Sequence, residues 1–151
     1  PVLHRDITPG TILAVAEQPL TVKLGDFGLA GHIDPVARLM RAAGTVRYQP
    51  PEAAWGYATE ATDLYAIALI LYEMLTGAAA FPLPAASELR SGDDVAAAIR
   101  RVDRSQFHPP SELRSRLPPW IDAVLDTALA ESTSHRFASA DSFREALEGA
   151  A

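Results

Sequence analysis

The sequence predicts a mainly α-helical fold with a small β-hairpin region near its N-terminus, which is an α+β arrangement. Two observations carry this prediction. Residues Thr21–Leu24 alternate like a half-buried strand, and a polar, proline-containing connection, Val15–Pro19, separates them from Ile12-Leu13. From Thr59 onward the apolar residues follow the period of helices instead. With 151 residues, 48% of them apolar, the chain suits a single domain or lobe with a sizeable core.

The N-terminal residues are expected to form three short strands. Val2-Leu3 would end the first strand, Ile12-Leu13 would begin the second, and Leu20–Leu24 would form the third. This order brings two carboxylates, Asp6 and Asp26, to neighbouring loop ends of one small hairpin. Paired carboxylates in such loops can remove a proton and hold a divalent metal ion at once.

Residues 29 to 51 are expected to be irregular, because two glycines and three prolines interrupt any long element. Only Ala37–Ala43 has the composition for two turns of helix. A long loop inside a compact domain is usually either functional or disordered. This stretch is therefore a candidate for a working part of the site.

A buried central helix is expected over Asp63–Thr76, with Thr59 or Thr62 as its N-cap and Gly77 as its end. Its residues are apolar on nearly every face, whereas a helix at the surface of a domain has a polar face. We therefore expect other elements to surround it.

Three further helices complete the prediction. They are a helix led by Asp93-Asp94 and reaching Arg101, one over Trp120–Ala130 opened by Pro118-Pro119, and a last helix capped by Ser139 and closed by Gly149. Residues 103–117 are expected to be a polar loop, and Ser132–Phe137 a turn. We interpret Trp55 and Trp120 as packing anchors.

Composition excludes several classes of protein. The net charge of −6 and the pI near 5.1 speak against a nucleic-acid partner. The absence of cysteine excludes disulfides, thiolate metal sites and cysteine nucleophiles. The longest apolar run, Leu64–Tyr72, is too short to cross a membrane, which takes about 20 residues. No signal-peptide pattern opens the sequence, so we expect a cytoplasmic location and no membrane segment.

The chemistry-bearing motifs resemble those of one family. His4-Arg5-Asp6, followed twenty residues later by Asp26-Phe27-Gly28, resembles the catalytic and metal loops of eukaryotic-type protein kinases. Gly44–Glu52 is similar to their substrate-docking loop, with Pro50 where the family has alanine. Asp63–Ala68 and His135–Phe137 resemble the start of the buried helix and an arginine-containing turn. The order of these five motifs resembles the C-terminal lobe of a bacterial-type serine/threonine kinase over residues 1–151, with 29–52 as its activation and docking loop.

The resemblance implies roles for three residues in phosphate transfer. Asp6 would be the base that orients and deprotonates a protein serine or threonine hydroxyl. Asp26 would hold Mg²⁺ against the phosphates of ATP. Thr45 would form a hydrogen bond near Asp6, and the Gly44-Thr45 pair resembles serine/threonine kinases more than tyrosine kinases.

The resemblance also implies a set of supporting residues. Glu52 and Arg136 should form an ion pair, and Asp63 should accept backbone N–H bonds from the loop around Asp6. His4 and Phe27 should join a hydrophobic column between the lobes. The supporting set is His4, Arg5, Phe27, Gly28, Glu52, Asp63 and Arg136.

Two residues depart from the family pattern. Thr8 replaces the lysine that usually neutralises the transferring phosphate, and Thr11 replaces the asparagine that usually binds a second Mg²⁺. We keep Thr8 as a catalytic candidate and Thr11 as a nucleotide and metal ligand. Losing one preorganised charge-stabilising group typically costs about 10²–10³ in rate.

Three functions therefore stay open. The first is an active serine/threonine protein kinase that uses ATP and Mg²⁺ on a protein substrate. The second is a pseudokinase scaffold or binding module, for which Thr8 and Thr11 speak. The third is a small-molecule phosphotransferase with a kinase-like fold, although such enzymes generally lack a docking segment like Gly44–Glu52.

The sequence contains no glycine-rich phosphate loop and no paired lysine and glutamate that would hold ATP from a second lobe. Pro1 stands almost directly before His4-Arg5-Asp6. We therefore expect the chain to be a fragment of a longer polypeptide with the N-terminal kinase lobe upstream, and to be inactive when alone.

Overall fold

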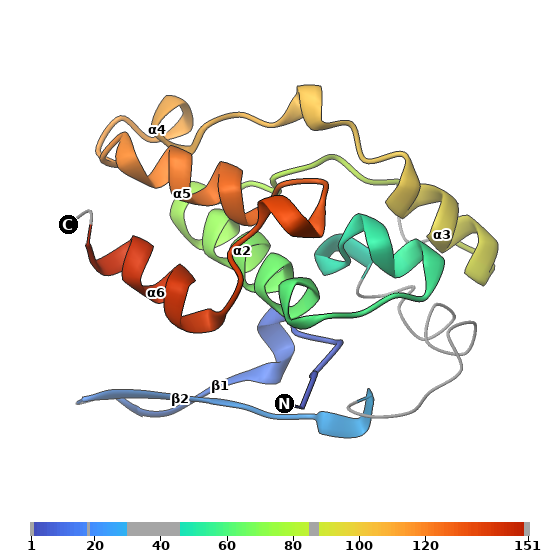
Figure 1. The fold of residues 1–151 in the computed structure, drawn as a ribbon, viewed down its shortest axis with the longest axis horizontal. Helices are drawn as coiled ribbons and strands as arrows, with labels where there is room; N and C mark the ends of the chain where they lie inside the picture. Colours follow the sequence, from blue (N-terminus) through green and yellow to red (C-terminus); the bar gives the residue numbers. More distant parts are fainter. Residues whose placement is uncertain (1, 18, 30–45, 85–87, 150–151) are drawn as a thin grey trace.

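A central helix organises the computed structural model, which describes residues 2–17, 19–29, 46–84 and 88–149. Helix α2 (Glu60–Thr76) crosses the middle of the molecule. Helices α4 (Pro110–Leu113), α5 (Trp120–Ala128) and α6 (Ala140–Glu148) gather on one side of it, and α3 (Gly92–Arg100) lies on the other (Figure 1). The mainly helical fold with one small hairpin, expected from the sequence, is confirmed.

The first residue of α2 is Glu60, three positions earlier than predicted. Thr59 is its N-cap, and the Thr62 hydroxyl accepts a hydrogen bond from the Thr59 backbone N–H at 2.9 Å. The capping pair therefore adds a turn before the first apolar residue. At the other end Gly77 adopts a left-handed conformation with φ of 75°, as a C-cap glycine does.

The main core lies between α2, α5 and α6. Tyr65, Leu69 and Tyr72 of α2 pack with Leu125 and Phe143 and are almost completely buried. A second cluster joins α3 to the 3₁₀ turns η4 (Val46–Tyr48) and η5 (Pro51–Trp55). A third and smaller cluster consists of Ile7, Ala66 and Ile70, and it fastens the N-terminal loop to α2.

Two antiparallel strands form the hairpin, β1 (Ile12–Glu17) and β2 (Leu20–Leu24). Ile12 pairs with Leu24 and Glu17 with Leu20, and the register shifts between Ala14 and Ala16. The predicted connection over 15–19 is therefore too long, because Val15–Glu17 belong to β1. The expected strand at Val2-Leu3 is wrong: no residue before Ile12 pairs with a strand in the part of the chain that the structure describes.

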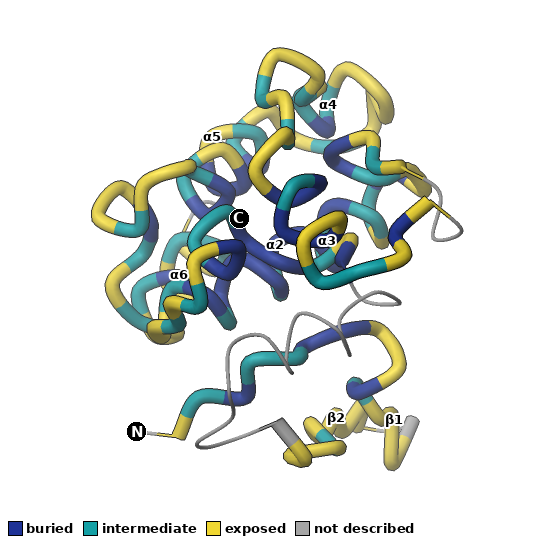
Figure 2. The backbone as a smooth tube through the Cα atoms, turned by 90° about the vertical axis from the view of Figure 1, so that its right-hand side faces the viewer, coloured by how far each residue is buried: buried dark blue, intermediate teal, exposed yellow. Residues whose placement is uncertain are grey.

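The prediction of a half-buried β2 is also wrong. All five of its residues are exposed, including Leu20, Val22 and Leu24 (Figure 2). An alternating strand has a face suited to burial, but it is buried only if another element packs against it. Here the helices lie on the far side of the N-terminal loop, so they do not cover β2.

The C-terminal half follows the prediction with small differences. Helix α5 ends at Ala128 rather than 130, and Leu129 just beyond it is fully buried. The predicted loop over 103–117 contains the 3₁₀ turn η7 (Arg104–Gln106) and α4, and the turn near 132–137 contains η8 (Thr133–His135). Trp120 packs against the main core as expected.

Trp55 does not anchor packing, because 67% of it is exposed. It ends η5, and Gly56 turns the chain directly after it with φ of 77°. His108 and His135 lie at the surface. No helix within the described ranges is both long enough and apolar enough to span a bilayer.

Candidate active site

The carboxylate of Asp63, in the first turn of α2, holds the loop that carries Asp6. It accepts hydrogen bonds from the backbone N–H of His4 at 2.8 Å and of Arg5 at 2.7 Å. These groups lie almost sixty residues from Asp63 in the sequence, so the bonds tie the N-terminal loop directly to the central helix. The predicted contact of Asp63 is therefore present.

The ring of His4 connects this loop to the segment before Asp26. Its Nε2 lies 2.9 Å from the carbonyl oxygen of Gly25, while its Nδ1 lies 3.4 Å from the backbone N of Asp6. Because a carbonyl can only accept and a backbone N–H can only donate, the ring carries its hydrogen on Nε2. His4 also packs against Phe27 with ring centroids 4.7 Å apart. The two acidic loops are therefore neighbours.

Two residues of these loops have left-handed backbone conformations. Arg5 has φ of 69° and Asp26 has φ of 57°, and both are non-glycine residues. Such conformations cost free energy and persist only where surrounding contacts fix them. At Arg5 the hydrogen bond to Asp63 supplies such a contact. The strain coincides with the two motifs that the sequence singled out.

Thr8 and Thr11 form a short turn, η1 (Pro9–Thr11), directly after Asp6. The Thr11 hydroxyl accepts a hydrogen bond from the Thr8 backbone N–H at 3.0 Å. As a donor it lies 3.0 Å from the Thr8 carbonyl oxygen and 3.4 Å from the Asp6 carbonyl oxygen. Thr8 and Thr11 are both buried, 8% and 7% exposed. The hydroxyl that was predicted to bind metal thus takes part in hydrogen bonds that shape the loop.

The sequence contained a signal for this role of Thr11. Thr8 and Thr11 are three residues apart, as are Thr59 and Thr62 and also Ser139 and Ser142. In each pair the second hydroxyl accepts the backbone N–H of the first residue, at 3.0, 2.9 and 3.1 Å respectively. This is the arrangement of a capping box with a hydroxyl in place of the usual glutamate or glutamine.

Asp26, Phe27 and Gly28 are all exposed to solvent. The backbone N–H of Gly28 donates to the Asp26 carboxylate at 3.4 Å, and a side chain at Gly28 would approach that oxygen to 3.2 Å. No three His, Cys, Asp or Glu side chains cluster as a metal site within the described ranges. Mg²⁺ usually takes only one or two ligands from a protein and its remaining oxygens from phosphates and water. Asp26 fits the role of such a protein ligand.

Glu52 and Arg136 form the predicted ion pair. The two terminal guanidinium nitrogens of Arg136 donate to the two carboxylate oxygens of Glu52 at 2.7 and 2.9 Å. The Arg136 side chain is completely buried, and its five N–H groups also reach three backbone carbonyls. Thr62 donates to the same carboxylate at 3.0 Å. Arg136 lies 4.5 Å from the ring centre of Tyr65, whose pKa is raised mainly by burial. The segment that ends at Glu52 is therefore anchored to the turn before α6.

Sequence reasoning missed a second anchor of this segment. Tyr48 donates its hydroxyl to Glu73 of α2 at 2.7 Å, and Arg47 pairs with the same carboxylate at 3.0 Å. Burial and the hydrogen bond to Glu73 raise the pKa of Tyr48 to about 12. The three residues carry no spacing signal, since Glu73 is distant in sequence from the other two.

Some of the predicted residues lie outside the part of the chain that the structure describes. They are Thr45, the expected helical turns at 37–43, and the portion 30–45 of the activation and docking loop. His4, Arg5 and Asp6 are brought next to the Asp26 segment, whereas Glu52 and Arg136 form a separate supporting centre.

Comparison with known proteins matches residues 1–148 to the protein kinase domain family. The chain is 34% identical over 148 residues to a probable serine/threonine-protein kinase PknB of Bifidobacterium longum, covering 95% of this chain and 20% of that protein. It is 32% identical to the serine/threonine-protein kinase PknB of Mycobacterium tuberculosis, covering 97% of this chain and 22% of that protein. The chain thus spans about a fifth of the length of these relatives.

The fold has a counterpart among solved structures. The Rad53 kinase domain, determined with SCD2 and AMPPNP, superimposes with a TM-score of 0.65 at 21% identity. That match covers 95% of this chain and 49% of the other. The order of the motifs, the contacts of Asp63 and Glu52, and the match over nearly the whole length agree. The chain belongs to the protein kinase family.

Proposed function

We propose that the protein containing this chain is a serine/threonine kinase that transfers the γ-phosphate of ATP to a serine or threonine hydroxyl of a protein. The observation that carries the proposal is the double tether of the Asp6 loop. Asp63 fixes its backbone from α2, and His4 ties it to Gly25 beside Asp26. Two carboxylates are thereby held on neighbouring loops, as transfer between a bound phosphate and an aimed hydroxyl requires.

In this proposal each acidic residue has one task. Asp6 would orient the substrate hydroxyl and accept its proton, while Asp26 would hold Mg²⁺. When bound, the metal would supply positive charge to neutralise charge that develops on the phosphate. Thr8 and Thr45 would donate hydrogen bonds near the transferred phosphate, and Thr11 would offer its remaining lone pair to a second metal ion.

The nucleotide would be held between this chain and an upstream N-terminal lobe. We infer that lobe because the sequence has no glycine-rich phosphate loop and no paired lysine and glutamate, and because the relatives are about five times longer. The protein substrate and the cytoplasmic location belong to the same proposal.

The experiment that tests this proposal follows phosphate from γ-labelled ATP into protein. Full-length protein is incubated with Mg²⁺ and a mixture of protein substrates, and the labelled amino acids are then identified. We expect phosphoserine or phosphothreonine, lost when Mg²⁺ is removed and reduced at least about 10²-fold in Asp26→Asn. Label on a small molecule instead of protein would contradict the proposal.

A pseudokinase is the second candidate, and one observation favours it. The Thr11 hydroxyl already serves the backbone of its own loop, and buried Thr8 carries no positive charge. Thr11→Asn distinguishes the two readings. If the wild type transfers phosphate and Thr11→Asn changes the rate less than about threefold, the threonine is tolerated; if only Thr11→Asn is active, the native protein is a scaffold.

A further inference from the structure

An exposed tryptophan stands beside a hollow that the phosphotransfer proposal does not use. Trp55 is 67% exposed, and Tyr57, two residues further on, is 70% exposed. Single exposed apolar side chains are common, but Trp55 also lines a hollow, and exposed aromatic side chains in hollows are a feature of interaction sites. What surrounds Trp55 therefore decides whether it has a binding role.

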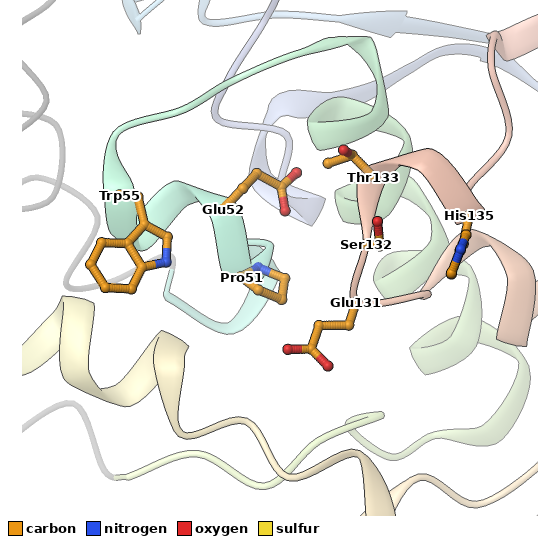
Figure 3. Close-up of a pocket in the computed structure, with 7 residues that line it drawn as sticks. All are labelled: Pro51, Glu52, Trp55, Glu131, Ser132, Thr133 and His135. Atoms are coloured by element: carbon orange, nitrogen blue, oxygen red, sulfur yellow. The ribbon is translucent and has the colours of Figure 1, made fainter.

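Two adjoining hollows form one groove, which we call the η8 groove because both are lined by Thr133 of η8. The first has a volume of about 580 Å³ and lies between the η5 residues Pro51 and Trp55 and the segment that begins at Glu131 (Figure 3). The second, about 400 Å³, continues past Thr133 to Glu60 at the start of α2. A groove of this extent accommodates several side chains of an extended segment.

The groove carries three acidic side chains, and His135 is the one basic side chain among its described lining residues. Glu52, Glu60 and Glu131 line it, whereas no lysine or arginine is among its described lining residues. Arg136 neutralises Glu52 from below. Glu131 forms no ion pair with the described residues, although Arg100 and Arg104 line an adjoining hollow together with it. Among the described lining residues, Glu60 and Glu131 are therefore the carboxylates whose charge no ion pair neutralises.

The indole already accepts one cation. The guanidinium of Arg100 in α3 lies 5.2 Å from the centre of the Trp55 ring, a distance at which cation–π attraction operates. The large exposed fraction of Trp55 leaves much of its remaining surface open. Beneath the groove, the Glu52–Arg136 pair and its backbone contacts hold the floor rigid, which lowers the cost of ordering the site on binding.

We propose that the η8 groove docks an extended, lysine- or arginine-containing segment of a partner protein. The aliphatic stem of a basic side chain lies over Trp55 and Pro51, and its charged head meets the Glu131 carboxylate. A purely apolar segment would leave Glu131 facing it, and an acidic segment would meet the carboxylates of Glu60 and Glu131. This inference goes beyond phosphotransfer and does not require it.

The test uses the full-length protein and a labelled peptide array in which lysine or arginine is placed singly and in pairs within an alanine-serine background. A matched array carries citrulline or norleucine in place of the basic residues, keeping length while removing charge. Binding is followed by fluorescence polarisation. We expect peptides with basic residues to bind and their neutral counterparts to bind at least about fivefold more weakly, with weaker binding as salt rises.

Three variants assign the binding to this groove. Trp55→Ala should weaken it about tenfold and Glu131→Gln about threefold, because the first removes the ring and the second only one exposed charge. Glu145→Gln, which removes another exposed carboxylate, on α6, should leave it unchanged. Glu131→Gln keeps the shape of the side chain, so its result stands even if Trp55→Ala disturbs η5.

Several results would overturn the proposal. They are equal binding of basic and neutral peptides, binding that survives both groove variants, and no binding by any peptide up to about 1 mM. Concentration-dependent dimerisation that Trp55→Ala abolishes would assign the groove to a second copy instead. Phosphate transfer is measured separately on the same samples. Protein that binds basic peptides but transfers no phosphate would contradict the proposed kinase activity and leave the docking groove intact.

Discussion

The helical body and the N-terminal segment hold their charged residues in opposite ways. In the body, Arg136 is completely buried, and all five of its N–H groups find oxygen acceptors. In the N-terminal segment, Asp26 is exposed, and the loop of Asp6 is fixed through its backbone by a carboxylate of α2. The body supplies rigidity, and the segment with the candidate chemistry derives its order from contacts with the body.

The largest expected effect is on the body. Arg136→Ala leaves the Glu52 carboxylate partly buried without its partner, which should lower the free energy of unfolding by about 3–5 kcal/mol. Denaturant titration measures this. Arg144→Ala, at an exposed arginine that pairs with Glu148, should cause no measurable change. Equal stability of the two variants would show that the buried pair does not support the fold.

The next effect should be confined to the N-terminal segment. Asp63→Asn removes the charge from an acceptor of two backbone N–H groups, and we expect a loss of about 1.5–3 kcal/mol in the opening free energy of the His4–Ile7 loop. Hydrogen exchange measures that opening directly. Asp122→Asn is the matched control, because Asp122 accepts two hydrogen bonds from Ser111 within the body. If Asp122→Asn opened the His4–Ile7 loop equally, the two regions would not be separable.

A smaller effect compares the same capping arrangement in both regions. Thr11→Val and Thr62→Val each remove the hydroxyl that accepts a backbone N–H three residues earlier. Thr11→Val should cost about 1 kcal/mol locally in η1, whereas Thr62→Val should cost about 2 kcal/mol in the whole body because it also removes the hydrogen bond to Glu52. Hydrogen exchange at Thr8 and Thr59 separates the two. Protection at Thr8 that survives Thr11→Val would mean that the hydroxyl is free to bind metal.

The smallest effect concerns the link between η4 and α2. Because the pKa of Tyr48 is raised to about 12 from its usual 10, the folded state retains this proton more strongly than the unfolded state. Its contribution to stability is therefore complete below pH 10 and is lost as the pH rises towards 12. Tyr48→Phe should make this alkaline loss shallower in denaturant titrations. An unchanged pH profile would contradict a raised pKa of Tyr48 in the folded protein, and with it the contribution of the Glu73 hydrogen bond.

The sequence was most informative where an element could be recognised from local pattern. Helix α2, its glycine end and the α6 cap follow from apolar period and capping residues, and the Glu52–Arg136 and Asp63 contacts follow from family motifs. Tertiary packing decided the rest. Nothing local shows that every residue of β2 is exposed, that Trp55 points to solvent or that Tyr48 reaches Glu73.

The candidate site divides in the same way. Asp6 and Asp26 were recognised from their motifs, and the structure brings their loops together through His4. The role of Thr11 within the loop was overlooked, although its spacing from Thr8 repeats at two helix caps. Thr45 lies outside the described residues, so its role stays a prediction.

The most direct test of the central claim compares the full-length wild type with Asp6→Asn in γ-phosphate transfer to protein. The substitution keeps the size of the side chain and one accepting oxygen, and it replaces the basic carboxylate oxygen with an NH₂ group that can only donate. We expect labelled serine or threonine from the wild type, at least about 10²-fold less from Asp6→Asn, and identical unfolding curves. Equal transfer by both proteins, or no transfer by the wild type, would contradict the assignment of this loop as the catalytic centre.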